Sequence, residues 1–132
     1  MKRAFALALV ALSSCTTTAD TRGPELLAEA LEGRVAGETR QCVGFTQSGR
    51  SFEIIDAITL LYHESSARVW RNNLRDACPG LHRDDILVLE PFGSQYCRND
   101  RVRAVDRNTG FAHAYCLLGD FVAYDKPKAR TD

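Results

Sequence analysis

The stretch ITLLYHESSARVWR, residues 58–71, decides the fold class of this chain. Ile58, Leu60 and Tyr62 alternate with their neighbours, and this period of two is typical of a half-buried strand. The polar residues 64–66 are typical of a hairpin loop, and Val69 and Trp70 lie in the run that follows. The stretch therefore predicts two antiparallel strands joined by a tight turn.

Short apolar or β-branched runs separated by turn residues recur on both sides of this hairpin. They predict further strands at residues 42–45, 52–55, 86–90, 102–105, 111–117 and 121–124. Pro24 suits a first helical position, and the apolar residues that follow predict one short helix over residues 24–31, which Gly33 ends. About six to seven short strands predict a mainly β domain, a small antiparallel barrel or sandwich with one N-terminal helix.

The composition is that of a soluble globular chain. Its 132 residues include 17 basic and 17 acidic side chains, with 45% hydrophobic and 26% charged residues. This balance excludes a disordered tail, a collagen-like fibre and a protein that binds nucleic acid by bulk charge. The chain also lacks a glycine-rich phosphate loop and the G-x-S-x-G and H-E-x-x-H motifs. We therefore expect no cofactor and no nucleic-acid partner.

The first 16 residues carry signals of export. Lys2 and Arg3 precede an unbroken apolar run at residues 4–12, which is too short to span a bilayer but suits a signal peptide. Residues 12–15, LSSC, resemble a bacterial lipobox, which implies cleavage before Cys15 and a diacylglycerol on its sulfur. Thr16 stands where a retention signal for the inner membrane has Asp. We therefore expect a lipoprotein on the periplasmic face of the outer membrane, anchored through this lipid.

These signals divide the chain into four parts. We expect a signal peptide at residues 1–14, a polar tether at 15–23, a single mainly β domain at 24–125 and a frayed, charged tail at 126–132. Removal of Lys2 and Arg3 leaves a weakly acidic mature chain. Its net charge offers no general attraction to anionic partners.

Four further cysteines predict two disulfides: Cys42, Cys78, Cys97 and Cys116. An even number in a small exported domain is typical of a disulfide framework, and none of the spacings matches a C-x2-4-C metal site. Four cysteines allow three pairings. We favour Cys78–Cys97 with Cys42–Cys116, because the segment between residues 78 and 97 holds one predicted strand that must turn back at each end.

A set of short stretches along the domain also carries a resemblance. They are LEGR at residues 31–34 with Gly37, Cys42, residues 55–61, residues 69–72 with Leu74, CPGL at 78–81, Cys97 with Asp100, and CLLGDF at 116–121 with Tyr124. Together they resemble an uncharacterised family of small exported bacterial proteins, many of them lipoproteins. One departure is Ala123, where the family tends to have proline. The resemblance implies a shared fold and export, and it supplies no catalytic residue.

His82, Asp84 and Asp85 form the loop cluster that best suits chemistry, as a general base or a site for a hard metal. One interpretation is a periplasmic hydrolase that uses His82 with Asp84 or Asp85. The other is a solvated loop without a catalytic role. We favour the loop, because a domain this small has little protein to wall such a site. We expect the three side chains to be exposed and not to meet around a pocket.

Arg98, Arg101 and Arg103 predict a small basic patch, with Arg101 and Arg103 on one strand face. Such a patch suits a negatively charged envelope component, such as lipopolysaccharide phosphates or peptidoglycan carboxylates. Asp100 and Asp106 are interleaved with the arginines. The alternative is therefore a mixed-sign sheet face with cross-strand ion pairs.

The leading interpretation is a lipid-anchored envelope protein whose domain is a non-catalytic binding or structural module. Its expected partner is an envelope protein or polysaccharide. The alternatives are the hydrolase described above and an inhibitor that presents a loop to an envelope enzyme. Trp70 suits a ligand-stacking surface, but we expect it in the core because a single Trp on a short strand of a small domain is usually buried.

Overall fold

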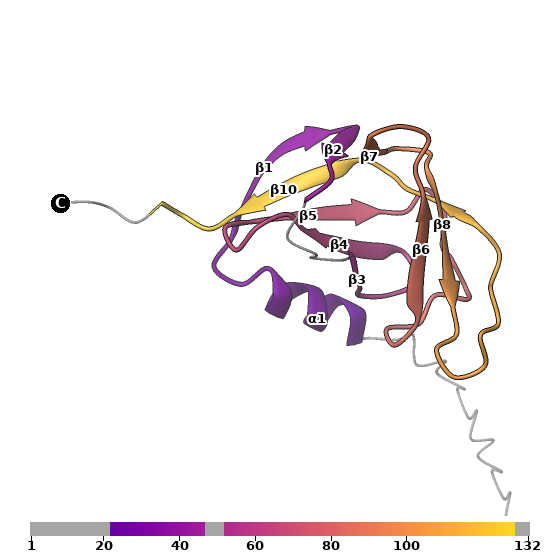
Figure 1. Cartoon of the computed structure of the whole chain (residues 1–132). Helices are drawn as coiled ribbons and strands as arrows, with labels where there is room; N and C mark the ends of the chain where they lie inside the picture. The colour runs from indigo at the N-terminus through magenta and orange to yellow at the C-terminus, as the bar shows by residue number, and fades with distance from the viewer. Residues whose placement is uncertain (1–21, 47–51, 129–132) are drawn as a thin grey trace, which may run out of the picture.

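The computed structural model describes residues 22–46 and 52–128, which form one helix and three antiparallel sheets (Figure 1). The signal peptide, Cys15 and most of the tether lie outside the described residues, so those interpretations stay predictions. Within the described part, no helix has the length and apolar character of a membrane span.

The described residues contain ten strands. The helix is α1 (Arg22–Ala30). The strands are β1 (Val35–Arg40), β2 (Cys42–Gly44), β3 (Phe52–Ile54), β4 (Thr59–His63), β5 (Arg68–Asn73), β6 (Ile86–Glu90), β7 (Gln95–Cys97), β8 (Arg101–Val105), β9 (Cys116–Leu117) and β10 (Phe121–Asp125).

The predicted hairpin is the centre of the largest sheet, whose strand order is β1-β10-β5-β4-β3. Leu60 lies opposite Asn72, and Tyr62 lies opposite Trp70. The loop between the strands is closed by Ser65, whose hydroxyl oxygen accepts a hydrogen bond from the backbone N–H of Arg68 at 3.0 Å. The hairpin prediction is therefore confirmed.

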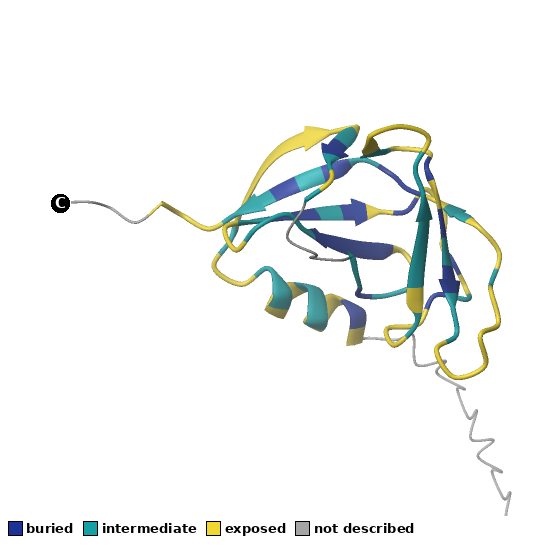
Figure 2. Cartoon of the chain, in the orientation of Figure 1, coloured by how far each residue is buried: buried dark blue, intermediate teal, exposed yellow. Residues whose placement is uncertain are grey.

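At the centre of this sheet both faces carry buried apolar side chains, and successive residues of a strand point to opposite faces. Leu60, Tyr62 and Trp70 lie on the face that packs into the main core, and Trp70 is fully buried as expected. Leu61 and Val69 lie on the other face, beneath α1. Figure 2 shows β4 and β5 among the most buried strands and β1 as an exposed edge.

The helix survives because its apolar stripe docks on the sheet. Leu26, Leu27, Ala30 and Leu31 pack against this second face. Gly33 follows with a φ of 72°, a left-handed conformation that glycine adopts without steric cost and that ends the helix as predicted. At nine residues, α1 covers only part of the face.

The two smaller sheets, β6-β8-β9 and β2-β7, complete the domain without closing it into a barrel. The fold is mainly β as predicted, but it has more strands than expected because β1 and β7 were not foreseen. The predicted strand at residues 111–117 is reduced to β9 and an isolated bridge between Val105 and Ala112. Residues 113–115 carry no strand pairing.

All four domain cysteines are oxidised as predicted, but the favoured pairing is wrong. The bridges are Cys42–Cys97 and Cys78–Cys116. The reason is β7, which pairs with β2 and places Cys42 directly opposite Cys97. The bridges span 55 and 38 residues, and the loop-entropy model assigns about 4 kcal/mol of stability to each.

Candidate functional site

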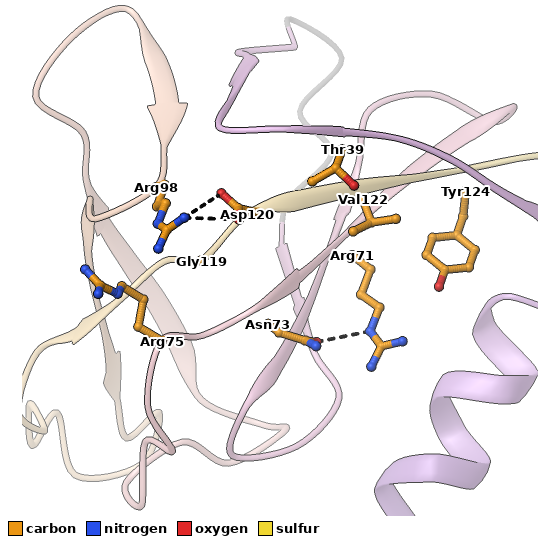
Figure 3. Close-up of a pocket in the computed structure, with 9 residues that line it drawn as sticks. All are labelled: Thr39, Arg71, Asn73, Arg75, Arg98, Gly119, Asp120, Val122 and Tyr124. Atoms are coloured by element: carbon orange, nitrogen blue, oxygen red, sulfur yellow. Dashed lines mark hydrogen bonds and ion pairs between the residues drawn. The ribbon is translucent and has the colours of Figure 1, made fainter.

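A pocket of about 550 Å³ lies on the face of the large sheet that α1 leaves uncovered (Figure 3). Arg71 and Asn73 share the face of Val69, which packs beneath the helix. Val122 lies opposite Arg71, and Tyr124 lies opposite Val69. The pocket is therefore a continuation of the helix-covered face over β5 and β10. Its lining is Thr39, Arg71, Asn73, Arg75, Arg98, Gly119, Asp120, Val122 and Tyr124.

Three arginines reach this pocket from two parts of the chain. Arg71 lies on β5, Arg75 follows that strand, and Arg98 follows β7. In Figure 3, Arg75 and Arg98 lie at one end, Tyr124 lies at the other end near the helix, and Arg71 lies between them. We call this site the arginine pocket.

The arginines differ in their partners. Arg98 forms an ion pair with Asp120, with its Nη1 atom 3.2 Å from Oδ2. Arg71 donates from Nε to the amide oxygen of Asn73 at 3.1 Å, and Arg75 donates from Nη1 to the amide oxygen of Asn99 at 2.6 Å. These two amide oxygens are neutral. Among the described residues, no carboxylate oxygen lies within 4.0 Å of a guanidinium nitrogen of Arg71 or Arg75.

The arginine pocket therefore carries a positive charge that its own lining does not neutralise. Three guanidinium groups face one carboxylate, that of Asp120. Each guanidinium has five N–H donors in a fixed planar arrangement, and the hydrogen bonds described above use only a part of them. Such donors match the oxygens of a carboxylate or a phosphate.

The floor of the pocket is fixed by a buried hydrogen-bonded pair, which we call the Asn72–Gly119 clasp. Asn72 is fully buried, and its amide donates to the carbonyl of Gly119 at 2.8 Å. The N–H of Gly119 donates back to the Asn72 amide oxygen at 2.9 Å. A Cβ atom at position 119 would lie only 1.9 Å from the carbonyl oxygen of Asn73, so this position requires glycine.

The turn that carries Arg98 is fixed in the same way. Asp100 is buried, and its carboxylate accepts a hydrogen bond from the N–H of Cys97 at 2.7 Å. The N–H of Asn99 donates to the carbonyl of Leu118, and the N–H of Leu118 donates to the carbonyl of Asp100. Asn99 has a φ of 72°, a left-handed conformation that asparagine tolerates better than most residues. The arginines are therefore mounted on a pre-organised frame.

The structure divides the predicted basic patch. Arg98 lines the arginine pocket, whereas the Arg101 and Arg103 guanidiniums lie over the ring of Tyr115, at 4.7 and 4.8 Å from its centre. Arg101 also forms an ion pair with Glu90, its cross-strand neighbour, at 2.8 Å. This part of the patch is the mixed-sign sheet face that the sequence allowed as an alternative.

Glu90 is tied to the same group by a second contact. The hydroxyl of Tyr115 donates to the Glu90 carboxylate, and this bond lowers the pKa of Glu90 below its usual value. The same bond raises the pKa of the Tyr115 hydroxyl. The first shift keeps the Glu90 carboxylate charged and the second keeps the Tyr115 hydroxyl protonated as its donor. Arg101 therefore has a charged carboxylate as its ion-pair partner, which Arg71 and Arg75 lack.

The structure places the predicted loop cluster in two environments. His82 and Asp84 are exposed as expected, but Asp85 is not, because its side chain is only 6% exposed. Its Oδ2 atom accepts a hydrogen bond from the backbone N–H of His82 at 2.9 Å and closes the turn between them. His82 and Asp85 line two different pockets. The two side chains do approach each other, with Nδ1 of His82 3.4 Å from Oδ2 of Asp85, but among the described residues no one pocket is lined by both, as the hydrolase interpretation requires.

Comparisons of the chain with protein-family models, with curated proteins and with solved structures found no match. The resemblance to an uncharacterised exported family therefore stays a prediction. The function is argued below from the geometry of the arginine pocket.

Proposed function

We propose that this protein is a lipid-anchored component of the cell envelope whose β domain binds an anionic group without catalysis. The observation that carries the proposal is the pairing of Arg71 and Arg75 with neutral amide oxygens, beside Arg98, in one pocket. A carboxylate or phosphate would supply the negative charge that these two guanidiniums lack.

The expected affinity for a single anionic group is modest. Hydrogen bonds to charged groups contribute about 1.5–3 kcal/mol each, but the pocket is open and water competes for every donor. A lone phosphate should therefore bind with a Kd on the order of 1 mM, which corresponds to about 4 kcal/mol. A larger envelope component that also contacts Tyr124 and Val122 would bind more tightly.

The lining favours binding over catalysis. It contains no histidine and no cysteine, and its one carboxylate, Asp120, is held by Arg98. A reaction at this site would need a nucleophile or a general base within hydrogen-bond distance of the bound group. The four domain cysteines are all in disulfides and supply no thiolate.

The envelope location rests on two supports. The signal peptide and lipobox-like sequence ending at Cys15 predict export and lipidation. Two disulfides favour an oxidising compartment such as the periplasm. A lipid on Cys15 would hold the arginine pocket close to the phosphate- and carboxylate-rich surface polymers that we propose as its ligands.

The test is an NMR titration of the purified protein carrying Cys15→Ser, at low ionic strength, with sodium phosphate and separately with sodium acetate. Backbone amide shifts should move around residues 71–75, 98–99 and 119–120. The double variant Arg71→Gln/Arg75→Gln should reduce the affinity at least tenfold. The matched control is Arg101→Gln/Arg103→Gln, which removes the same charge elsewhere on the domain and should leave the affinity within a factor of two.

An equal loss of affinity in the two double variants would show that only the net charge of the domain matters. This result would overturn the proposal that the arginine pocket binds the anion. Unchanged phosphate and acetate affinities in Arg71→Gln/Arg75→Gln would overturn it as well. If phosphate binds and acetate does not, the ligand is a phosphate-bearing component; the reverse result points to a carboxylate.

A further inference from the structure

Three side chains with metal-binding atoms meet at a place that is separate from the arginine pocket. They are His82, Asp85 and His113, and their ligand atoms all lie within 4.8 Å of one another. The Nδ1 atom of His82 is 3.4 Å from Oδ2 of Asp85, and the two imidazole rings are 6.2 Å apart at their centres. His113 comes from residues 113–115, the unpaired segment just before β9.

The Cys78–Cys116 disulfide explains why these side chains meet. Cys78 stands four residues before His82, and Cys116 stands three residues after His113, so the bridge ties together the two segments that carry the imidazoles. The backbone N–H of His113 donates to the carbonyl of Ala104 at 2.9 Å, which fixes its segment against β8.

The position of His113 depends on a second close approach. A Cβ atom built on Gly80 would lie 2.5 Å from Nδ1 of His113. The imidazole therefore rests directly on the backbone of Gly80, where any larger residue would displace it. This contact holds the ring beside the turn that carries His82 and Asp85.

Asp85 gives the cluster a buried charge. Its side chain is 6% exposed, whereas that of His82 is 69% exposed. A carboxylate removed from water is costly unless a donor, a cation or a metal compensates it. The backbone N–H of His82 donates to Oδ2 of this carboxylate, and Nδ1 of the His82 ring lies 3.4 Å from the same oxygen.

We propose that His82, Asp85 and His113 bind a divalent transition-metal ion such as Zn²⁺. Two imidazole nitrogens and one carboxylate oxygen suit zinc, nickel, copper or cobalt and do not suit Mg²⁺ or Ca²⁺, which take oxygen ligands. Atoms bound to one zinc in a tetrahedral site lie about 3.3 Å apart. The His82–Asp85 pair already has this spacing. The three ligand atoms all lie within 4.8 Å of one another, so side-chain shifts of up to about 1.5 Å would bring the set to the zinc spacing.

The exposure of His82 leaves room for water at a fourth coordination position. The surrounding charges are mixed. Arg83 follows His82, and Arg107 donates from Nε to the carbonyl of Asp84 at 3.2 Å. Asp84 carries the opposite charge in the same turn. The ion is therefore held by its three ligands and not by a negative surface.

The test is a titration of ZnCl₂ into the untagged protein carrying Cys15→Ser, after dialysis against EDTA. Two-dimensional NMR of the imidazole nitrogens follows all three histidines at once. We expect the ring signals of His82 and His113 to shift together at one equivalent of Zn²⁺, with a Kd on the order of 10 μM, about 7 kcal/mol. The ring of His63, which pairs with Glu53 at 2.8 Å, should not shift, and MgCl₂ should shift none of the three.

Calorimetry of variants then assigns the ligands. His82→Ala changes an exposed side chain and should leave the fold intact while weakening Zn²⁺ binding at least tenfold. Asp85→Asn keeps an acceptor for the His82 backbone and should weaken binding by a similar factor. His63→Ala is the matched control and should leave the affinity unchanged. The proposal would be overturned if Zn²⁺ shifted only one of the two rings, or if it bound His82→Ala or Asp85→Asn as tightly as it binds the wild-type protein.

Discussion

Replacing Asn72 with alanine should remove both hydrogen bonds of the Asn72–Gly119 clasp beneath the arginine pocket and destabilise the fold. The side chain is fully buried and makes two hydrogen bonds to one peptide group, at 2.8 and 2.9 Å. Alanine removes both partners and leaves the N–H and the C=O of Gly119 without them. Gly119 is itself buried, so its N–H and C=O lose their partners where few other partners are within reach.

The loss of stability can be worked out from the two backbone groups of Gly119 that are left without hydrogen-bond partners. A buried donor or acceptor left without its partner costs about 1–3 kcal/mol. Two such groups therefore predict a loss of about 4 kcal/mol in the free energy of unfolding. That loss is a large fraction of the 5–15 kcal/mol that small domains possess. The adjacent residue provides the control, because Asn73 is exposed and its side-chain amide accepts a hydrogen bond from the Arg71 side chain.

The assay is urea unfolding with the disulfides intact, followed by the fluorescence of Trp70. This residue is the only tryptophan of the chain and is fully buried, so its emission reports the loss of the core. Asn72→Ala should lower the unfolding free energy by about 4 kcal/mol, and Asn73→Ala should lower it by less than about 1 kcal/mol. A similar loss of unfolding free energy in the two variants would refute the reasoning. Burial and the number of hydrogen bonds would then not determine how much stability the substitution removes.

Three further predictions concern bonds and charges elsewhere in the chain. Non-reducing peptide mapping should recover a Cys42–Cys97 peptide, and the double serine variant at these positions should lose about 4 kcal/mol of stability. The hydrogen bond from Arg68 holds the pKa of Asp125 below its usual 3.8. The charged Asp125 carboxylate therefore contributes its full stabilisation of the fold above about pH 5. The stability difference between wild type and Asp125→Asn, measured in urea, should therefore shrink as the pH falls from 5 to 2. Cys15→Ala should abolish lipidation, and mass spectrometry that finds another, unmodified mature N-terminus in the wild type would contradict the anchor.

The strands that the sequence predicted are those with an apolar face that packs on the core. β4, β5 and β6 carry apolar residues in an alternating or continuous pattern, and their hairpin or turn signals mark the ends. β1 leaves no such trace, because all six of its residues are exposed at the edge of the sheet. β7 has only three residues. Backbone hydrogen bonds to β10 and β2 create these two strands, and side-chain patterns do not encode such bonds.

The missed strand β7 had a consequence for the disulfides. Without β7, the segment between residues 78 and 97 appeared to hold one strand, whose flanking turns would bring Cys78 and Cys97 together. Its pairing with β2 instead carries Cys97 to Cys42 and leaves Cys78 for Cys116. Three residues of edge pairing thus decide between two covalent frameworks, and no spacing rule contains that information.

Only one of the three arginines of the arginine pocket was predicted from the sequence. Arg98 stood out because it lies in a run of arginines, whereas Arg71 and Arg75 lie more than twenty residues earlier. The antiparallel pairing of β5 with β10 brings the end of β5 beside the start of β10, and the hydrogen bond from Asn99 to Leu118 brings the turn that carries Arg98 to the same place. The polar residues 71–73 at the end of an otherwise buried strand were the available signal, since three polar residues in a row break the alternation expected there.

The two disulfides each adjoin one of the two proposed sites. Cys97 precedes Arg98 directly, and Cys78 and Cys116 flank the segments of His82 and His113. Loops of a small domain with three separate sheets have little core to hold them, so covalent links at their bases replace packing. Side chains mounted beside such links lose less freedom when a ligand binds. The bridges therefore stabilise the fold and, at the same points, keep the arginine pocket and the histidine cluster close to the geometry that an anion or a metal ion requires.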